Sequence, residues 1–599
     1  MAKQKTRSEV DNNYKWDLTK IYLNDSEWEK DYELFKNDMT EISKFKGIIT
    51  RSAKDLLEYL NTYNALDRRI EKLYMYAHLN HDADTTDTMY QEMYGKVRKL
   101  LNDFESLDSY ANPELMSVDY NVIEKYISEE EGLKEYSYLL ENLYRFKSHI
   151  LSDKEEELLS NLSLSLGSSS DTYNSLTDSD MKFGNIKDEN GEEVELTESN
   201  YTNFIHSSDR NVRKEAFTRL LETYGSYKNT LASTFSGNVK TLTSLAKIKN
   251  FNSSLEASLF NDKIDVLVYN NLIKTVKDNM NVIYKYFDLK KEVLNLDELH
   301  LYDIYLEMVK DLDKEYSFLE AKELVINALK PLGENYVNDL KQAFEQKWID
   351  VYNNVGKRGG AYSSGGYDTY PYILLNYEGK LKDVSTLAHE LGHSMHSYYS
   401  VKNNTYPNYS YKIFVAEVAS TVNELLLNFY LLENSNDEKE KLYILNSLME
   451  LFKGTIYRQV MFAEFERDMN SKYENGEVLT NELLCNEYYK LNKEYFGDNV
   501  VVDEQIKYEW ERIPHFYYNF YVYKYAIGLS CACYIVDGIL NGRENVREDY
   551  LKFLSMGGSD YPANELKVAG IDITSSEVIE SAIKMFEKTI EDFKKIYNK

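Results

Sequence analysis

Residues that interrupt helices are scarce along this chain. Its 599 residues include 6 prolines and 25 glycines, whereas average usage would give about 30 and about 42. Proline breaks a helix interior and glycine weakens it, so a chain poor in both can run through long helices. We therefore expect a mainly α fold. We also expect two or more packed units, because a single core rarely serves so many residues.

Acidic residues outnumber basic ones. The 100 Asp and Glu against 70 Lys and Arg leave a net charge of −30, which argues against a broad basic surface for nucleic acids. The three cysteines form neither a disulfide framework nor a paired zinc motif. No apolar run of about 18 residues could span a membrane, and the first residues lack the apolar segment of a secretion signal. We expect a soluble, cytoplasmic protein. The sequence carries no signal for its oligomeric state.

The helical periodicity is interrupted near residue 190. Between Met181 and Thr197, Asn190 and Gly191 separate two short alternating runs, which is typical of a β-hairpin. Since this hairpin follows a helical stretch, we expect a boundary near residue 200, between an N-terminal helical region (1–200) and a second region (201–599). Toward the end of the chain, steps of three and four predict a helix with one buried face, formed by Ile579, Ile583, Phe586, Ile590 and Phe593.

A second interruption is rich in glycine. Five glycines lie between residues 356 and 366, which favours a loop with unusual backbone angles. The following segment, Tyr370 to Tyr377, has the pattern of a strand. Pro371 near its start indicates a strand at the edge of a sheet, with one side free to pair.

The segment LAHELGHSMHSYY contains H-E-x-x-H, formed by His389, Glu390 and His393. On a helix, residues four apart share a face, so both imidazoles can bind one metal ion. Glu390 lies beside the first histidine and cannot easily bind the same ion, but it can take the proton from a water held there. The motif therefore predicts a zinc hydrolase. The alternative is a helix with incidental histidines.

A catalytic zinc needs a third protein ligand, and two candidates exist. Glu417 lies on the polar strip of a second, very apolar helix, where a carboxylate needs a partner. His396 shares the face of the first two histidines but lies roughly 10 Å along the axis from His389, so we favour Glu417. His396 is then expected to support the ligands or touch substrate, and Glu424 to hydrogen-bond a ligand histidine. A solvated face is the alternative for Glu417.

A third cluster occurs in IPHFYYNFYVYKYAIG. If Pro514 starts a helix, the next aromatic residues share an arc of about 120°. Phenol and imidazole groups beside a metal could stabilise an oxyanion. Since the chain has 54 tyrosines, ordinary core packing is the alternative. The arc contains His515, Tyr518, Tyr521 and Tyr525.

The sequence resembles the oligoendopeptidase F family, within the thimet-oligopeptidase-like clan of zinc peptidases. The resemblance rests on GKRGGAYSSGGYDTYPYILLNY, LAHELGHSMHSYY, FVAEVASTVNE and IPHFYYNFYVYKYAIG, in that order, and covers nearly the whole chain. It implies a large helical body enclosing a deep substrate channel, a small β-sheet near the active site and a helical N-terminal lid.

The resemblance also implies the site. One Zn²⁺ per chain would be held by His389, His393 and Glu417, with Glu390 as the catalytic base. His515 and the tyrosines after it would stabilise the transition state, Tyr521 and Tyr525 as catalytic residues and Tyr518 as a substrate contact, with no ranking among the three. The edge strand at Tyr370 would bind an extended peptide by strand addition, approached through the glycines at 359, 360, 365 and 366, of which Gly359 and Gly360 are the expected substrate contacts.

We therefore expect a zinc endopeptidase whose partners are short oligopeptides. A zinc carboxypeptidase or dipeptidyl carboxypeptidase is one alternative, and it would need a cation such as Arg358 or Lys357 for the terminal carboxylate. A protein that binds oligopeptides without cutting them is another, but binding alone does not require Glu390.

Overall fold

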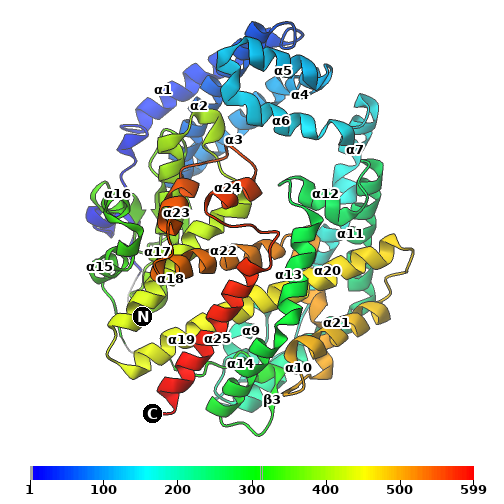
Figure 1. Cartoon of the computed structure of the whole chain (residues 1–599), viewed down its shortest axis with the longest axis vertical. Coiled ribbons are helices and arrows are strands. Elements are labelled where there is room, and N and C mark those ends of the chain that lie inside the picture. Colours follow the sequence, from blue (N-terminus) through cyan, green and yellow to red (C-terminus); the bar gives the residue numbers. More distant parts are fainter. Residues whose placement is uncertain (1–3, 311, 313) are drawn as a thin grey trace. The chain divides into compact units, whose positions relative to one another are not determined.

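The computed structural model describes residues 4–310, 312 and 314–599, and helices dominate it (Figure 1). The mainly α class expected from the scarcity of proline is confirmed. Contacts group the chain into two compact units, each built from three stretches, so this grouping differs from a single division near residue 200. Unit 1 comprises Met1–Lys147, Asp313–Tyr430 and Ile535–Ile571. Unit 2 comprises Ser148–Leu312, Leu431–Tyr534 and Asp572–Lys599.

Unit 1 begins with a series of helices, in which Ala53–Ala83 (α2) runs for 31 residues without proline or glycine. Ser52 caps it, since its hydroxyl accepts a hydrogen bond from the Asp55 N–H at 3.2 Å. The other helices that begin in this unit are α1 (Asp25–Asp38), α3 (Thr88–Asp108), α4 (Ala111–Met116), α5 (Tyr120–Glu129), α6 (Ser137–Arg145), α15 (Phe318–Ala328), α16 (Glu334–Glu345), α17 (Leu381–Asn403), α18 (Ile413–Asn434), α23 (Val546–Leu554) and α24 (Pro562–Val568).

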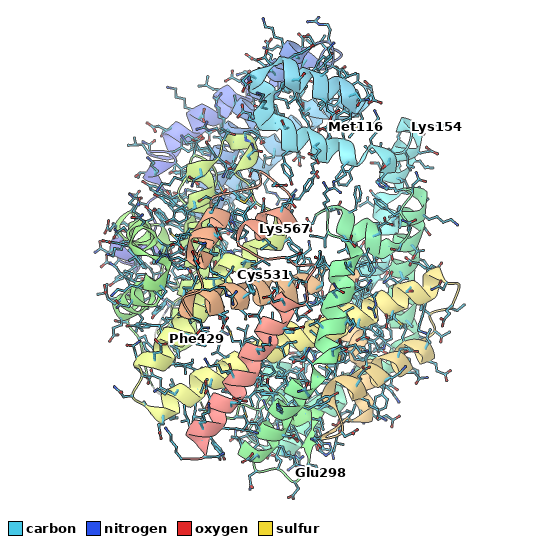
Figure 2. All side chains as sticks on the ribbon, viewed as in Figure 1. Met116, Lys154, Glu298, Phe429, Cys531 and Lys567 are labelled. Carbon is cyan, nitrogen blue, oxygen red and sulfur yellow. The ribbon has the colours of Figure 1, made fainter. Side chains whose placement is uncertain are left out.

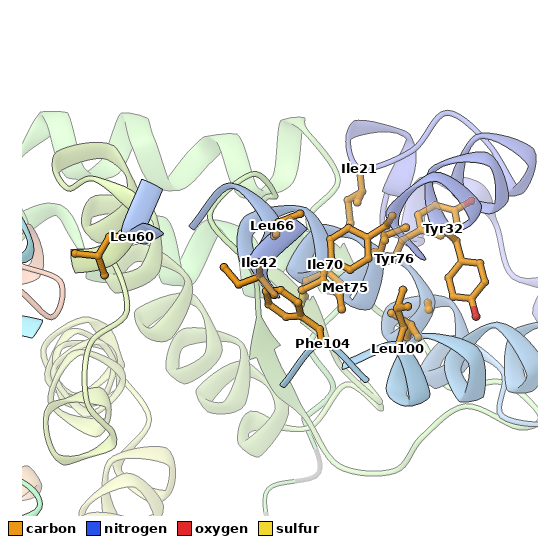
Figure 3. Packing of buried hydrophobic residues seen from close by; sticks show 14 of the residues in the cluster. Ile21, Tyr32, Ile42, Leu60, Leu66, Ile70, Met75, Tyr76, Leu100 and Phe104 are labelled. Carbon is orange, nitrogen blue, oxygen red and sulfur yellow. The ribbon is translucent and has the colours of Figure 1, made fainter. Parts of the chain in front are cut away.

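The N-terminal helices of unit 1 enclose a core of large apolar side chains (Figure 3). Ile70 on α2, Phe35 on α1 and Val97 on α3 are fully buried in it. The same core includes Tyr372 and Leu374, which come from a strand more than two hundred residues later. The N-terminal helices and that strand are therefore packed as one body.

The strand belongs to a small three-stranded sheet, in the order β4 (Ile349–Asp350), β6 (Tyr372–Leu374) and β5 (Tyr362–Ser364). β4 pairs parallel to β6, and β5 pairs antiparallel to it. The expectation that the segment from Tyr370 is an edge strand was wrong, because β6 is the central strand. Pro371 lies just before β6, so its missing N–H costs the sheet no hydrogen bond.

The two edges of this sheet differ. Beside β4, the Val351 N–H donates to the Tyr14 carbonyl and the Asp17 N–H donates to the Lys347 carbonyl, both at 2.9 Å. The N-terminal segment therefore covers that edge. β5, at the other edge, has a strand neighbour on one side only within the described residues. It is the open edge of the sheet.

Unit 2 contains the hairpin predicted from Asn190 and Gly191. β1 (Asn185–Lys187) and β2 (Glu193–Glu195) pair antiparallel, and Gly191 has a φ of 79°. β3 (Leu299–His300) and β7 (Val500–Val501) form a parallel pair. The helices that begin in this unit are α7 (Asp153–Leu166), α8 (Ser168–Asn174), α9 (Glu198–Ile205), α10 (Arg210–Ser226), α11 (Lys228–Ile248), α12 (Ser254–Phe260), α13 (Val266–Asp278), α14 (Met280–Val293), α19 (Glu438–Phe452), α20 (Arg458–Glu474), α21 (Asn481–Phe496), α22 (Tyr523–Leu540) and α25 (Glu577–Tyr597).

The apolar face predicted for the last helix is buried in α25, where Ile579, Phe586 and Phe593 are each at most 1% exposed. The three cysteines are buried, and none of them forms a disulfide. Figure 2 shows Cys531, which lies on α22. Among the described residues, we find no helix that is both long enough and apolar enough to span a bilayer.

Candidate active site

α17 carries the H-E-x-x-H motif. Its first turn is fixed by Asp383, whose carboxylate accepts hydrogen bonds from the backbone N–H groups of Glu378 and Lys380 at 3.0 and 2.9 Å. One face of the helix is fully buried, which leaves His389 and His393 on the other, partly exposed face. The fully buried face consists of Val384, Leu387, Leu391 and Met395.

Glu417, on α18, meets both histidines. Its Oε2 lies 3.6 Å from the Nε2 of His389 and 3.8 Å from the Nε2 of His393. Among the described residues, these three form the group whose ligand atoms could hold a metal ion. The structure therefore brings together the three side chains that the sequence and the resemblance single out.

A close approach of two helix backbones makes this meeting possible. A Cβ atom placed on Gly392, inside the motif, would lie 2.5 Å from the Cα of Ser420 on α18. Asn423 joins the same two helices, because its amide donates to the Ala388 carbonyl at 3.2 Å and its Oδ1 accepts from the Tyr336 hydroxyl at 3.1 Å. Sequence reasoning missed both residues. The glycine just before the second histidine of H-E-L-G-H was the available signal for Gly392.

The three donors fit a zinc ion. Zinc takes histidine nitrogens and carboxylate oxygens at about 2.1 Å, so donors of a tetrahedral site lie about 3.4 Å from one another. The distances of 3.6 and 3.8 Å are close to that value. Burial lowers the pKa of His393 to about 4, with the neighbouring His389 adding to the effect. Its imidazole is therefore neutral near pH 7, as a metal ligand must be.

Glu424 orients His389 from the side opposite the metal donors. The Nδ1 of His389 donates to the Glu424 Oε2 at 3.3 Å, and Ser385 donates to the other oxygen at 3.1 Å. Burial alone would lower the pKa of His389, but the hydrogen bond to Glu424 and nearby carboxylates raise it above its ordinary value. The Nε2 of His389 is thereby directed at Glu417. This is the position expected for Glu424.

Glu390 is the most buried carboxylate of the motif region, with 7% of its surface exposed. Its Oε2 has no hydrogen-bond partner among the described residues, and a backbone hydrogen bond from Ser363 reaches its carboxylate. Burial raises the pKa of Glu390 to about 7, with the Glu417 charge adding to the increase. A carboxyl group with a pKa near neutrality is well suited to accept and return a proton.

Ser363 ties the open edge strand to α17. Its hydroxyl hydrogen-bonds the hydroxyl of Ser394 at 2.8 Å, one residue beyond His393. Ser394, fully buried, also donates to the Pro371 carbonyl at 3.3 Å. β5 therefore lies directly beside Glu390. Neither serine was predicted, because neither belongs to a motif that can be read without the fold.

The glycines on either side of β5 serve two purposes. Gly359 and Gly360 are exposed, and an added Cβ would meet nothing within 4 Å at either position. Gly365 and Gly366 instead face packed atoms, with a Cβ 2.9 Å from Pro371 and 2.7 Å from the Glu71 carboxylate. For the first pair, contact with substrate stays a prediction, whereas the second pair is required by internal packing.

His396 lies away from the metal donors. It is 1% exposed, its ring stacks on Tyr411 at 3.7 Å, and Phe553 lies beside it. Burial lowers the pKa of His396 to about 3, and its Nδ1 has no hydrogen-bond partner among the described residues. It is not part of the metal-donor group.

In unit 2, the prediction that a helix begins at Pro514 was wrong. The chain makes a short 3₁₀ turn at Pro514–Tyr517, passes through left-handed Asn519 and Phe520 with φ of 56° and 59°, and enters α22 only at Tyr523. Buried Glu466 holds this bend by accepting the Phe520 N–H at 2.7 Å.

The aromatic rings nevertheless gather. The ring of His515 lies 5.5 Å from that of Tyr518 and 6.2 Å from that of Tyr525, and Tyr521 lies 5.3 Å from Tyr525. Tyr518 is the most exposed of them, at 55%. Burial lowers the pKa of His515. The cluster is therefore built by a bend rather than by a helical face.

Tyr370, the remaining predicted substrate contact, stacks on Trp348 with ring centroids 5.4 Å apart. It also borders a pocket beside the end of β5. Its ring is half-buried.

Comparisons with known proteins identify the family. Residues 203–585 match Peptidase family M3, and residues 114–183 match Oligopeptidase F. Oligopeptidase PepF of Bacillus subtilis (strain 168) is 46% identical over 593 residues, which cover 99% of this chain and 88% of that protein. A crystal structure from Chlamydophila abortus is similar with a TM-score of 0.95 and 38% identity, over 99% of this chain and 100% of that one.

The crystal structure of oligoendopeptidase-F from Enterococcus faecium has a TM-score of 0.73 and 34% identity, over 96% of this chain and 99% of that one. These similarities extend over nearly the whole sequence and include the segments that carry the metal donors. The chain therefore belongs to peptidase family M3, among the oligopeptidase F proteins.

Proposed function

We propose that this protein is a zinc-dependent endopeptidase that hydrolyses internal bonds of short oligopeptides. The observation that carries the proposal is the convergence of three metal donors from two helices beside a buried carboxylate with an unpartnered oxygen. The donors are His389, His393 and Glu417, and the carboxylate is Glu390.

In this proposal, His389, His393 and Glu417 would hold a zinc ion, which would supply the Lewis acidity that polarises a carbonyl and lowers the pKa of water. Glu390 accepts the proton of the attacking water on a carboxylate oxygen and returns it to the leaving nitrogen. Burial raises the pKa of the Glu390 carboxyl, which favours acceptance of the proton. Glu424 keeps the His389 ring oriented, through the hydrogen bond to Nδ1.

The substrate would bind along the open edge of β5. Backbone hydrogen bonds to an edge strand hold a peptide regardless of its sequence and require it to be extended. The Ser363 backbone already hydrogen-bonds Glu390, so a peptide on this strand would lie beside the proposed base. Gly359, Gly360 and Tyr370 would border it.

Two further parts of the proposal rest on the family resemblance. His515, Tyr521 and Tyr525 would donate hydrogen bonds to the oxyanion, with Tyr518 contacting substrate. The limit to short peptides and the cytoplasmic location stay predictions.

The two cations that could bind a terminal carboxylate in a carboxypeptidase already form ion pairs within the protein. Lys357 is buried and pairs with Asp350 at 2.7 Å. Arg358 pairs with Asp82 at 3.0 Å, and Asp82 is 1% exposed. Moving either cation onto a substrate carboxylate would take a charged partner from a buried carboxylate, leaving Asp350 with Arg7 alone and Asp82 with its hydrogen bonds to His81 and Tyr362, which is costly. This favours an endopeptidase.

A peptide blocked at both ends tests the proposal. The zinc-loaded protein is incubated with a short peptide acetylated at its N-terminus and amidated at its C-terminus, and the products are identified by mass spectrometry. We expect internal cleavage that stops on chelation and returns with added zinc. Cleavage only of the unblocked peptide, one or two residues from its C-terminus, would favour the carboxypeptidase, and binding without cleavage would favour the peptide-binding protein.

A further inference from the structure

A pocket of about 440 Å³ lies in unit 1 beside the end of β5. Residues 363–366 and 369–371 form one side, Ser397, Tyr398, Val401 and Lys402 on α17 form another, and residues 409–411 close it. Its volume is within the about 300–1,000 Å³ typical of ligand pockets. The metal donors and Glu390 do not line it.

The walls of this pocket include four tyrosine rings, and the hydroxyl groups of three of them are already bound. The Tyr411 hydroxyl pairs with Ser397 at 2.9 Å, and the Tyr398 hydroxyl donates to Asp339 at 3.3 Å. The Tyr409 hydroxyl donates to Glu71. These tyrosines therefore offer ring carbons to an occupant, which favours an apolar or aromatic group.

The pocket offers little charge to an occupant. Lys402 is the charged residue among its lining residues, and its ammonium lies 3.3 Å from Asp339 and 5.1 Å from the centre of the Tyr398 ring. Both contacts compensate the cation. An acidic side chain would therefore gain little from Lys402.

The pocket adjoins the strand that is proposed to hold the substrate. Ser363 and Ser364 belong both to its lining and to the open edge strand. Along α17, Ser397 and Val401 lie four and eight residues beyond His393, or about 6 and about 12 Å along the axis. An extended peptide advances about 3.3 Å per residue. A side chain reaching the pocket would therefore be about two to four residues from the cleaved bond.

We propose that this pocket is a specificity subsite for a bulky apolar side chain of the substrate, aromatic or branched aliphatic, about two to four residues from the scissile bond. The inference rests on the proposed function, since it assigns the occupant to a peptide held on β5. Val401 is the residue best placed to test it, because it is half-buried and has no side-chain hydrogen bond to lose.

The test uses blocked peptides of one sequence that carry Phe, Leu, Ala or Glu in turn at each position near the cut. For the zinc-loaded protein, we expect one position where kcat/KM for Phe exceeds that for Ala roughly tenfold or more. Val401→Trp fills the pocket and should bring this ratio close to one at that position only. Val401→Ala enlarges it and should increase the preference for Trp over Phe there.

The matched control is Val478→Trp, which places the same residue on unit 2 at a site 75% exposed and should leave the ratio unchanged. Thermal unfolding and zinc content verify that each variant is folded. A ratio that Val401→Trp and Val401→Ala both leave unchanged, or a preference for Glu over Phe, would overturn the subsite.

A binding measurement separates this inference from the proposed function. Zinc-loaded Glu390→Gln, with and without Val401→Trp, is titrated with fluorescent Phe and Ala peptides, and anisotropy gives both Kd values. A Phe preference that disappears with Val401→Trp supports the subsite even if the native protein cuts nothing. Cleavage without any positional preference, or no peptide binding at all, contradicts the subsite.

Discussion

Gly392 and Ser420 bring the backbones of α17 and α18 into contact, with only 2.5 Å between the Cα of Ser420 and a Cβ that Gly392 lacks. Glycine inside a helix normally costs stability relative to alanine. Here it allows the approach that places Glu417 beside His389 and His393. The motif therefore needs a small residue between its two histidines.

Gly392→Ala should destabilise unit 1 and weaken zinc binding. The new methyl group would overlap backbone atoms of α18, and overpacking of this kind costs about 1–3 kcal/mol. The matched control is Gly95→Ala, inside α3, where an added Cβ meets nothing within 4 Å and stability should rise by roughly 0.5–1 kcal/mol. Thermal unfolding and zinc titration measure both changes. Equal effects of the two substitutions would contradict the role of the close approach.

Glu417→Ala should lower zinc affinity steeply, because it removes one of three donors. His396→Phe should leave one zinc per chain, since it keeps a ring stacked on Tyr411 and removes both nitrogens. Bound zinc is measured by elemental analysis of the purified variants after dialysis. Full zinc content in Glu417→Ala, or its loss in His396→Phe, would reverse the assignment of the third ligand.

Glu390→Gln should lower kcat by about 10²–10⁴ while zinc stays bound, because the amide keeps the shape but cannot accept a proton. Glu378→Gln, which alters an exposed carboxylate just before α17, serves as the control. Single-turnover kinetics on the zinc-loaded proteins provide the measurement. A zinc-loaded Glu390→Gln variant with near-native kcat would exclude this residue as the base.

Tyr521→Phe or Tyr525→Phe should lower kcat more than it changes KM, because an oxyanion donor acts mainly in the transition state. The loss of one such donor typically costs about 10²–10³ in kcat. Tyr517→Phe is the control, since that hydroxyl hydrogen-bonds Thr234 at 2.8 Å and its ring stacks on Tyr173. If kcat is unaffected by Phe at positions 518, 521 and 525 alike, the cluster is core packing.

Glu466→Gln should make the protein more stable than the wild type in alkaline solution. Burial raises the pKa of the Glu466 carboxyl from 4.5 to about 8, so the folded state keeps a proton that the unfolded state releases. The unfolding free energy therefore falls as the pH rises from 4.5 through about 8. Glutamine still accepts the Phe520 N–H but does not titrate.

The measurement is the difference in thermal midpoint between wild type and Glu466→Gln at about pH 5 and about pH 8. The difference should shift in favour of the variant at the higher pH. Glu378→Gln, an exposed carboxylate, should show no such shift. A difference that is independent of pH would mean that Glu466 is ionised in the folded state.

The parts of the site set by local sequence could be predicted. His389, Glu390 and His393 follow from helical spacing, and Glu417 follows from a carboxylate on an otherwise apolar helix. Gly392 and Asn423 could not be assigned their roles, because these depend on the register of α18 against α17.

The two errors have a common cause, since both concern segments shaped by distant contacts. β6 is central only because β4, which begins at Ile349, pairs with the side of β6 that β5 leaves open. In the sequence, a proline one residue before a strand looks the same whether the strand is central or at an edge. The bend at Asn519 and Phe520 contains no glycine, and it depends on Glu466, more than fifty residues earlier.

The N-terminal segment that covers the β4 edge has a consequence for productive binding. An edge strand that recognises only peptide backbone cannot choose between substrates. If both edges of the sheet were open, substrate peptides would bind to both of them. A peptide on the β4 side would be held without being cut, which would lower the concentration of free substrate. Because Tyr14 and Asp17 already bond beside β4, the edge left for a peptide is the one next to Glu390.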